Sequence, residues 1–192
     1  MHGLSQRSPA SHGAPARIEE KILLMRFSPR TLGLLAALFV LILDQGHKAW
    51  MLSIFDIVAR APITVTPFLD LTISWNYGVS YSLFATHAVT ARLALICVQG
   101  VIVFGLLYWL WRATSRPFAL GLGLIIGGAL GNMTDRLFRG AVADFFYFHT
   151  SLPVGPLANY VFNVADVGIT LGAALLIIEG LTSSASGPST PA

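Results

Sequence analysis

The sequence carries very little charge. Only 11% of its 192 residues are Asp, Glu, Lys or Arg, whereas 55% are hydrophobic. A soluble domain typically has about a quarter charged residues, so this composition argues against one. Long apolar stretches with few charges indicate helices that span a membrane. A few such spans and their loops account for the whole length of the chain, so we predict a single membrane domain.

Cysteine is almost absent as well. Cys97 is the only one in the chain, so an intramolecular disulfide is excluded, and no Cys/His cluster indicates a structural zinc. Because Cys97 lies inside an apolar run, we expect it in the core. The net charge is +3, but the basic residues form no dense patch beside aromatic residues. Nucleic-acid binding is therefore not predicted.

Four apolar runs predict an all-α integral membrane protein. Polar, low-complexity segments flank them, so residues 1–30 and 183–192 are predicted to be flexible tails around a membrane domain at 31–182. The predicted spans cover residues 31–54, 88–111, 117–137 and 160–181.

Basic residues set the predicted orientation. Lys and Arg gather before the first span and between the second and third, and such positions face the cytoplasm. Both termini are then cytoplasmic, and two loops at about 55–87 and 138–159 face outward. In the first loop, Leu71, Ile73, Trp75 and Tyr77 alternate with polar residues. This period of two predicts a strand in a small sheet on the outer membrane surface.

This topology brings polar side chains from separate segments into one shallow layer of the outer leaflet. Acids inside a membrane face the protein interior and pair with something. Asp44 and Lys48 are four residues apart on a helix and can pair. Asp144 and Asp166 have no cation nearby in the sequence. The layer comprises Asp44, Lys48, Asn76, Asn132, Asp135, Arg136, Asp144, Asn163 and Asp166.

Two carboxyl groups without a cation can do chemistry if they meet. Held close in a partly dry site, they share one proton, which leaves one acid and one base at neutral pH. Such a pair activates a water and protonates a leaving amine, as in aspartic peptidases. Asn132 and Asn163 can orient the carboxyl groups or a substrate backbone. Asp144 alone is equally a candidate for a solvated loop residue, whereas an acid within an apolar helix, such as Asp166, indicates function by itself.

Simpler interpretations stay open for the other polar residues. Asp44 with Lys48 is favoured as a structural pair, and Asp135 as the partner of an arginine that holds helix ends together. Arg136 is a candidate for an interfacial anchor or for a substrate-positioning residue. Asn76 lies before a glycine-containing turn and is a candidate for an ordinary turn residue.

Four segments resemble the signature blocks of bacterial lipoprotein signal peptidase, also called signal peptidase II. They occur in the order of that family, and the resemblance covers roughly residues 30–182. The third block is the most specific. The segments are "DQGHKAW" at 44–50, "NYGVSYSLF" at 76–84, "GGALGNMTDRLFRGAVADFF" at 127–146 and "FNVADVGI" at 162–169.

The resemblance implies a function and a set of roles. The protein would cleave the signal peptide from prolipoproteins before a diacylglyceryl-modified cysteine, as an inner-membrane monomer that contacts lipids and needs no metal or organic cofactor. Asp144 and Asp166 would be catalytic. The remaining roles would be substrate binding for Asn76, Gly78, Asn132, Arg136 and Asn163, and support of the polar network for Asp44, Lys48 and Asp135.

Two other classes of protein place acids in membrane spans. A proton-coupled transporter would have polar groups along a path through both leaflets, whereas here they stop at one layer. A metal-dependent lipid phosphotransferase also uses paired aspartates, but it would need more acidic ligands and would lose activity with a chelator.

Overall fold

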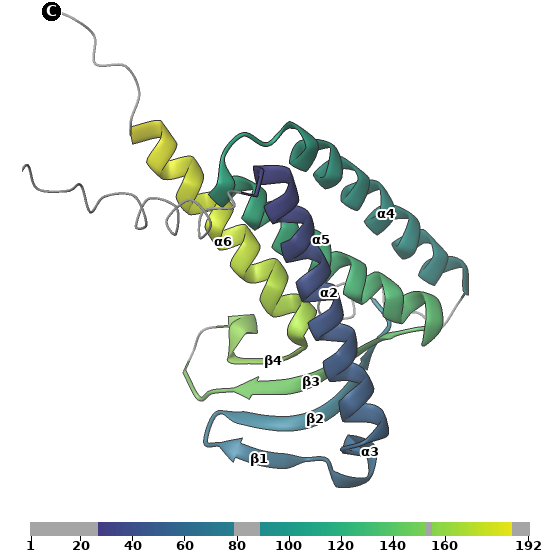
Figure 1. Ribbon diagram of the computed structural model, residues 1–192. Helices are drawn as coiled ribbons and strands as arrows, with labels where there is room; N and C mark the ends of the chain where they lie inside the picture. Colours follow the sequence, from purple (N-terminus) through teal and green to yellow (C-terminus); the bar gives the residue numbers. More distant parts are fainter. Residues whose placement is uncertain (1–26, 79–88, 153–154, 186–192) are drawn as a thin grey trace, which may run out of the picture.

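The computed structural model of the chain describes residues 27–78, 89–152 and 155–185. Within these ranges, four long helices stand side by side, and an antiparallel sheet is gathered at one end of them (Figure 1). Nearly all of the predicted N-terminal tail, and the C-terminal residues from 186 on, lie outside the described residues.

The four long helices are each long and apolar enough to cross a membrane, which confirms a multi-pass membrane protein. The first three agree with the predicted spans to within one or two residues at each end. The helices are α2 (Pro29–Ser53), α4 (Val89–Arg112), α5 (Arg116–Phe138) and α6 (Val164–Ala185).

Local sequence fixes where two of these helices begin. Ser28 precedes α2, and its hydroxyl accepts a hydrogen bond of 3.2 Å from the backbone N–H of Thr31. Ser115 does the same for α5, accepting from the N–H of Phe118 at 3.4 Å. In both helices a proline follows in the first turn, where its missing N–H costs nothing.

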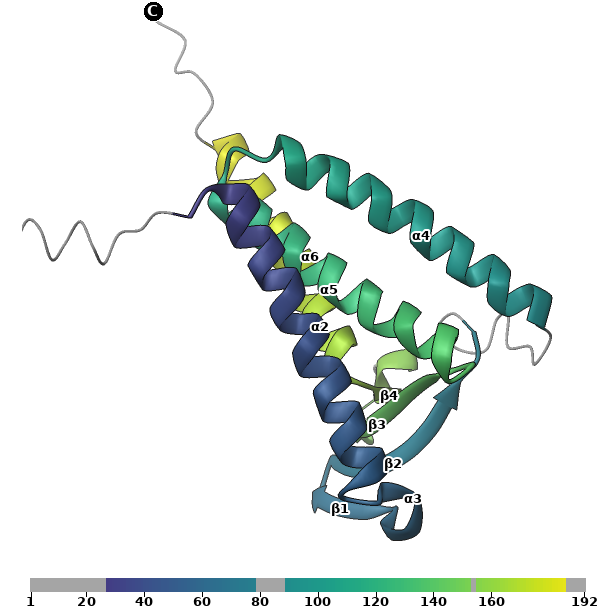
Figure 2. The ribbon, with the colours of Figure 1, turned by 45° about the vertical axis from the view of Figure 1, so that its right-hand side comes forward.

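Helix α5 is the central element of the bundle. It lies between α2 and α6, and small residues let the three backbones approach closely. Gly123 faces Gly33 of α2, and a side chain at Gly128 would collide with the carbonyl oxygen of Ala165 in α6. In contrast, only 11% of the α4 span is buried, and α4 lies along the outer side of the bundle (Figure 2). Cys97 is on this helix and is exposed, so its predicted place in the core is wrong.

The sheet has the strand order β1-β2-β3-β4, and each strand pairs antiparallel with its neighbours. The predicted strand is confirmed as β2, and β1 precedes it. The short helices α3 (Ile57–Arg60) and η2 (Gly155–Ala158) connect the larger elements. The strands are β1 (Ile63–Thr66), β2 (Leu69–Asn76), β3 (Val142–His149) and β4 (Asn159–Phe162).

The segment between the third and fourth spans is more regular than predicted. Much of the loop at 138–159 is strand β3, and Tyr160 belongs to β4, so the fourth helix begins at Val164 rather than at residue 160. Aromatic side chains occupy successive positions of β3, which hides the alternation that indicates a strand. Gly140, at φ +86°, turns the chain from α5 into β3, a conformation that favours glycine.

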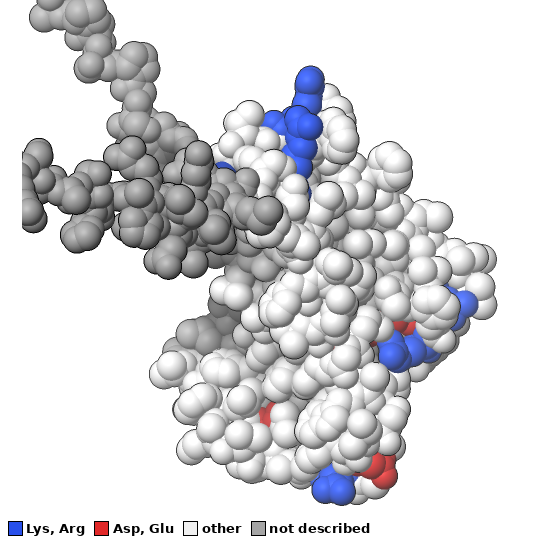
Figure 3. Space-filling model, in the orientation of Figure 1, with Lys and Arg blue, Asp and Glu red and all other residues white. Residues whose placement is uncertain are grey.

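Charge is sparse on the surface of the helical bundle. Figure 3 shows Lys and Arg near its two ends and an almost uncharged surface between them. The buried charged side chains instead lie where the helices meet the sheet. Because the sheet is at one end of the bundle, this arrangement confirms that the polar residues form one layer. The buried polar residues are Asp44, Lys48, Asn132, Asp135, Arg136, Asp144 and Asn163.

Candidate active site

Strand β3 carries Asp144 into the protein interior. Its residue partner on β2 is Ser74, and only 3% of Asp144 is exposed. The neighbouring residues Ala143 and Phe145 are completely buried and pack in the apolar cluster under the sheet. A carboxyl group is therefore held rigidly at the junction of sheet and helices, and not in a solvated loop.

Asp166 lies in the first turn of α6. Asn163, directly before the helix, accepts a hydrogen bond from the N–H of Asp166 through its side-chain Oδ1, at 3.1 Å. In return, Oδ2 of Asp166 accepts from the N–H of Asn163, also at 3.1 Å. This reciprocal pair is a capping box, and it fixes the Asp166 carboxyl at the positive end of the helix dipole.

Both carboxyl groups are held by asparagines. The side-chain amide of Asn163 donates to Oδ1 of Asp144 at 2.6 Å, and that of Asn76 donates to Oδ2 at 3.3 Å. The amide of Asn132 donates to Oδ1 of Asp166 at 2.9 Å. Asn163 also donates to Oδ1 of Asn132 at 3.1 Å. With the capping bond to Oδ2 of Asp166, all four carboxyl oxygens accept a hydrogen bond.

The surroundings of Asp144 favour its protonated form. Burial, followed by the charge of Asp166, raises the pKa of Asp144 from 3.8 to about 7. The hydrogen bonds from Asn163 and Asn76 and the charge of Lys48 act in the opposite direction and are outweighed. Near neutral pH the Asp144 carboxyl can therefore both hold and release a proton, which an ordinary aspartate does not do.

A buried lysine joins the helices beneath these carboxyl groups. Nζ of Lys48 lies 2.8 Å from Oδ2 of Asp44 and 2.7 Å from Oδ2 of Asp135, and all three side chains are fully buried. It also donates to Oδ1 of Asn132 at 3.4 Å. The other oxygen of Asp44 accepts from the backbone N–H of Ala165 in α6, at 2.9 Å. The predicted pairing of Asp44 with Lys48 is thus part of a network that links α2, α5 and α6.

Two members of this network were not predicted. Arg139 pairs with Asp135 at 2.5 Å, and the amide of Gln45 donates to both Asp44 and Asp135. Asp135 and Arg139 are four residues apart in the sequence, which is a signal for pairing on a helix. Gln45 gave no comparable signal, because its contact with Asp135 joins two distant segments. The predicted pairing of Asp135 with an arginine is confirmed, but Arg139 lies at the end of the same helix, and it is Lys48 of α2 that joins Asp135 to another helix.

Arg136 connects α5 to the segment after β2 and to α4. Its guanidinium donates to the carbonyl oxygen of Gly78 at 3.0 Å, to that of Asn132 at 3.3 Å and to Oε1 of Gln99 in α4 at 3.4 Å. The N–H of Gly78 in turn donates to Oδ1 of Asn76 at 3.1 Å. Arg136 therefore holds the chain just after β2 against α5, and Gln99 is a contact that the sequence did not predict.

The described residues include no group of three or more His, Cys, Asp or Glu side chains placed to hold a metal ion. Among these residues, Asp144 and Asp166 form no ion pair, and asparagine amides hold their carboxyl groups. What the arrangement offers is a pair of linked carboxyl groups, one of which titrates near neutral pH.

Comparison with known proteins gives a consistent result. Residues 36–182 match the family model described as signal peptidase (SPase) II. A lipoprotein signal peptidase of Beijerinckia indica subsp. indica is 49% identical over 85% of this chain and 96% of its own length. One from Methylocella silvestris is 45% identical over 82% of this chain and 90% of its own length.

Solved structures with the same fold are also known. One, described as a bacterial membrane enzyme structure obtained by the in meso method, has a TM-score of 0.69 and 25% identity, and it covers 83% of this chain and 93% of its own. A second with the same description has a TM-score of 0.64 and 27% identity over 78% of this chain and 92% of its own.

Proposed function

The chain belongs to the signal peptidase II family, and from this membership and the linked pair Asp144 and Asp166 we propose an aspartic endopeptidase of prolipoproteins. It removes the signal peptide by cleaving directly before the cysteine that carries diacylglycerol. The observation that carries this proposal is the bridge made by Asn163, which donates to both carboxyl groups. Such a bridge holds two acids in one place without neutralising either of them.

One carboxyl group acts as the base and the other as the acid. Between them they hold one proton, because the second ionisation is opposed by burial and by the first charge. The ionised carboxylate accepts a proton from a water whose oxygen attacks the carbonyl carbon of the scissile peptide. The protonated carboxyl donates its proton to the leaving nitrogen as the C–N bond breaks. A pKa of about 7 for Asp144 suits this exchange.

The surrounding polar residues orient the reaction. Asn76, Asn132 and Asn163 hold the carboxyl oxygens in fixed positions, and their amides leave the charge of the pair unchanged. Arg136 and Gly78 position the segment after β2 beside the site, where we place the substrate backbone. The roles of Asp44, Lys48 and Asp135 are structural, since the two carboxylates are balanced by Lys48 and Arg139.

The membrane orientation follows from the distribution of basic residues. Arg30, Arg112 and Arg116 lie at the ends of helices remote from the sheet, and we place that end in the cytoplasm with both termini. The site then lies near the outer face of the inner membrane. A substrate helix spanning the same membrane presents its cleavage site at this level, and its lipid can enter sideways from the bilayer. We expect the protein to act as a monomer.

A reconstituted cleavage assay tests this function. The full chain in lipid vesicles receives a prolipoprotein with and without diacylglycerol on its cysteine, and mass spectrometry identifies the products. We expect hydrolysis of the modified substrate only, at the bond before the cysteine, with equal rates in the presence and absence of EDTA. Cleavage elsewhere contradicts the proposed specificity. Activity lost with EDTA and restored by a metal ion contradicts the two-aspartate mechanism.

A further inference from the structure

An acid outside the site described above lies at the other end of the bundle. Glu179 interrupts the apolar run of α6 near its C-terminal end, whereas Asp166 is in the first turn of the same helix. The hydroxyl of Ser115 donates to Oε1 of Glu179, which joins α6 to the start of α5. An acid in an apolar membrane helix is costly to retain and points to a function.

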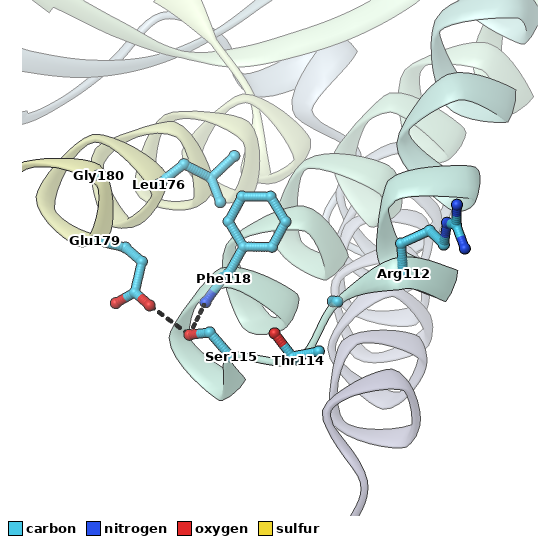
Figure 4. A pocket seen from close by; sticks show the side chains of 8 residues that line it. Arg112, Thr114, Ser115, Phe118, Leu176, Glu179 and Gly180 are labelled. Carbon is cyan, nitrogen blue, oxygen red and sulfur yellow. Dashed lines mark hydrogen bonds between the residues drawn. The ribbon is translucent and has the colours of Figure 1, made fainter. Parts of the chain in front are cut away.

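Glu179 borders a cavity of about 310 Å³ between the α4–α5 connection and the last turns of α6. Phe118 and Leu176 form its apolar wall, and Arg112, Thr114 and Ser115 line it on the side of the connection. Figure 4 shows Glu179 and Arg112 on opposite sides of the pocket, with Thr114 between them and the Arg112 guanidinium turned away from Glu179. The cavity thus has an acidic end, a basic end and an apolar wall.

The two charges of this cavity are not neutralised by each other. Within residues 27–78, 89–152 and 155–185, no ion pair includes Arg112 or Glu179. The Arg112 guanidinium lies over the ring of Tyr108, 5.7 Å from its centre. This contact holds the guanidinium against α4, on the side of the cavity opposite Glu179. A ligand that carries an anion and a cation on a short linker can therefore contact both groups.

We propose that this cavity binds the headgroup of an aminophospholipid. The phosphate contacts the Arg112 guanidinium and the Thr114 hydroxyl, and the primary ammonium donates to the Glu179 carboxylate. The glycerol end rests against Phe118 and Leu176. A volume of about 310 Å³ is at the lower end of the range of ligand pockets, ~300–1,000 Å³, so it admits a headgroup but not the acyl chains.

The neighbouring surface provides a place for those chains. Apolar side chains beside the cavity face outward from the bundle, with Trp111 65%, Ile177 64% and Leu181 69% exposed. The cavity also lies at an end of the membrane-spanning helices, where lipid headgroups are found. Bound in this way, the lipid joins the end of α4 to the end of α6, two helices that otherwise each pack mainly on α5.

Lipid titration followed by native mass spectrometry tests the proposal. The detergent-solubilised full chain receives phosphatidylethanolamine, phosphatidylcholine or phosphatidylglycerol with identical acyl chains. We expect phosphatidylethanolamine to bind tightest, because the choline group has no N–H to donate and the glycerol headgroup has no cation. Glu179→Gln should weaken phosphatidylethanolamine binding about tenfold, as expected for loss of one charge-assisted hydrogen bond, and leave phosphatidylglycerol binding unchanged.

Two variants and one soluble ligand complete the design. Arg112→Gln should weaken phosphatidylethanolamine and phosphatidylglycerol alike. Arg116→Gln is the matched control, since it removes a positive charge at the same end but its guanidinium contacts the Phe27 carbonyl and does not line the cavity. Equal affinities for the three lipids, or an unchanged preference in Glu179→Gln, overturn the proposal. Equal affinity for soluble glycerophosphoethanolamine overturns the assignment to a membrane lipid.

Discussion

Asn163 donates a hydrogen bond of 2.6 Å to Oδ1 of Asp144 from the position directly before α6. The same residue accepts from the first turn of that helix. One side chain therefore fixes the carboxyl group of a strand to the start of a helix that carries the second carboxyl group. The distance between the two carboxyl groups therefore depends on how the sheet is positioned against the helical bundle.

Replacement of Asn163 should separate its two contributions. Serine is as good a helix cap as asparagine but is too short to reach Asp144. Asn163→Ser should therefore keep the cap but lose the bonds to Asp144 and Asn132, and with them most of the activity and some stability, whereas Asn163→Ala should lose a further ~1 kcal/mol of stability with the cap. Thermal unfolding and cleavage rates in the same detergent measure both effects. If Asn163→Ser cleaves at the wild-type rate, the contact with Asp144 does not orient the reaction.

Lys48 should dominate the stability of the polar layer. Removing a fully buried cation between two buried carboxylates leaves uncompensated charge, and breaking such a pair costs ~3–5 kcal/mol. Lys48→Met keeps the side-chain volume and should lower the melting temperature strongly. Arg139→Gln is the comparison, because the Arg139 side chain is 27% exposed whereas Lys48 is fully buried, so water can partly replace the lost contact and the loss should be smaller. Equal losses in the two variants contradict the central place given to Lys48.

Close packing around Asp44 gives a prediction that is independent of function. A β-carbon at Gly131 would lie 2.6 Å from Oδ2 of Asp44, so Gly131→Ala must displace the carboxylate or the helix and should cost ~1–3 kcal/mol. Gly46→Ala places the same group in open space on α2 and should stabilise by up to ~1 kcal/mol through helix propensity. Thermal unfolding of both variants decides whether the contact at Gly131 is as tight as described.

The raised pKa of Asp144 predicts how stability depends on pH. The folded protein holds a proton on Asp144 up to about pH 7, whereas the unfolded chain releases it near 3.8. The folded state thus binds more protons in this window, and this contribution to stability is lost as the pH rises from 3.8 to about 7. Asp144→Asn cannot titrate, so the difference in melting temperature between variant and wild type should rise in favour of the variant from pH 4 to pH 8.

A difference between the two proteins that stays constant over this pH range contradicts the raised pKa. The Asp56→Asn variant provides the control, because Asp56 is in no ion pair among the described residues and its side chain makes no hydrogen bond to cap α3, so its replacement leaves Asp144 in place. If the pair works as proposed, activity should also fall above about pH 7, where Asp144 loses its proton.

The sequence predicted the bundle well because apolar length is a local property. The spans needed only a count of apolar residues, and the strand at Leu71–Tyr77 needed only alternation. Strand β3 was not predicted because Phe145, Phe146, Tyr147 and Phe148 place aromatic groups on both of its faces, and β4 was not predicted because most of it was included in the fourth span. Their pairing depends on contacts with distant residues, which a local pattern does not contain.

The sequence predicted which residues form the polar layer, but it did not predict most of the contacts between them. Topology brought Asp44, Lys48 and Asp135 to one level, yet the contact of Lys48 with both acids depends on how α2 packs against α5. The capping box at Asn163 and Asp166 has a sequence signature, an amide followed by an acid three residues later. It was hidden because the helix was expected to begin before Asn163. Gln99 gave no signal, since its partner lies on another helix.

Cleavage of a diacylglyceryl-modified prolipoprotein by Asp144→Asn and Asp166→Asn tests the two-aspartate mechanism most directly. Each substitution keeps the shape of the side chain and removes the carboxyl chemistry. We expect each variant to lose ~10²–10⁴-fold or more in rate, as for a group that transfers protons, while Asp70→Asn stays near the wild-type rate. Cleavage near the wild-type rate by either Asp144→Asn or Asp166→Asn, in a folded sample, contradicts the account.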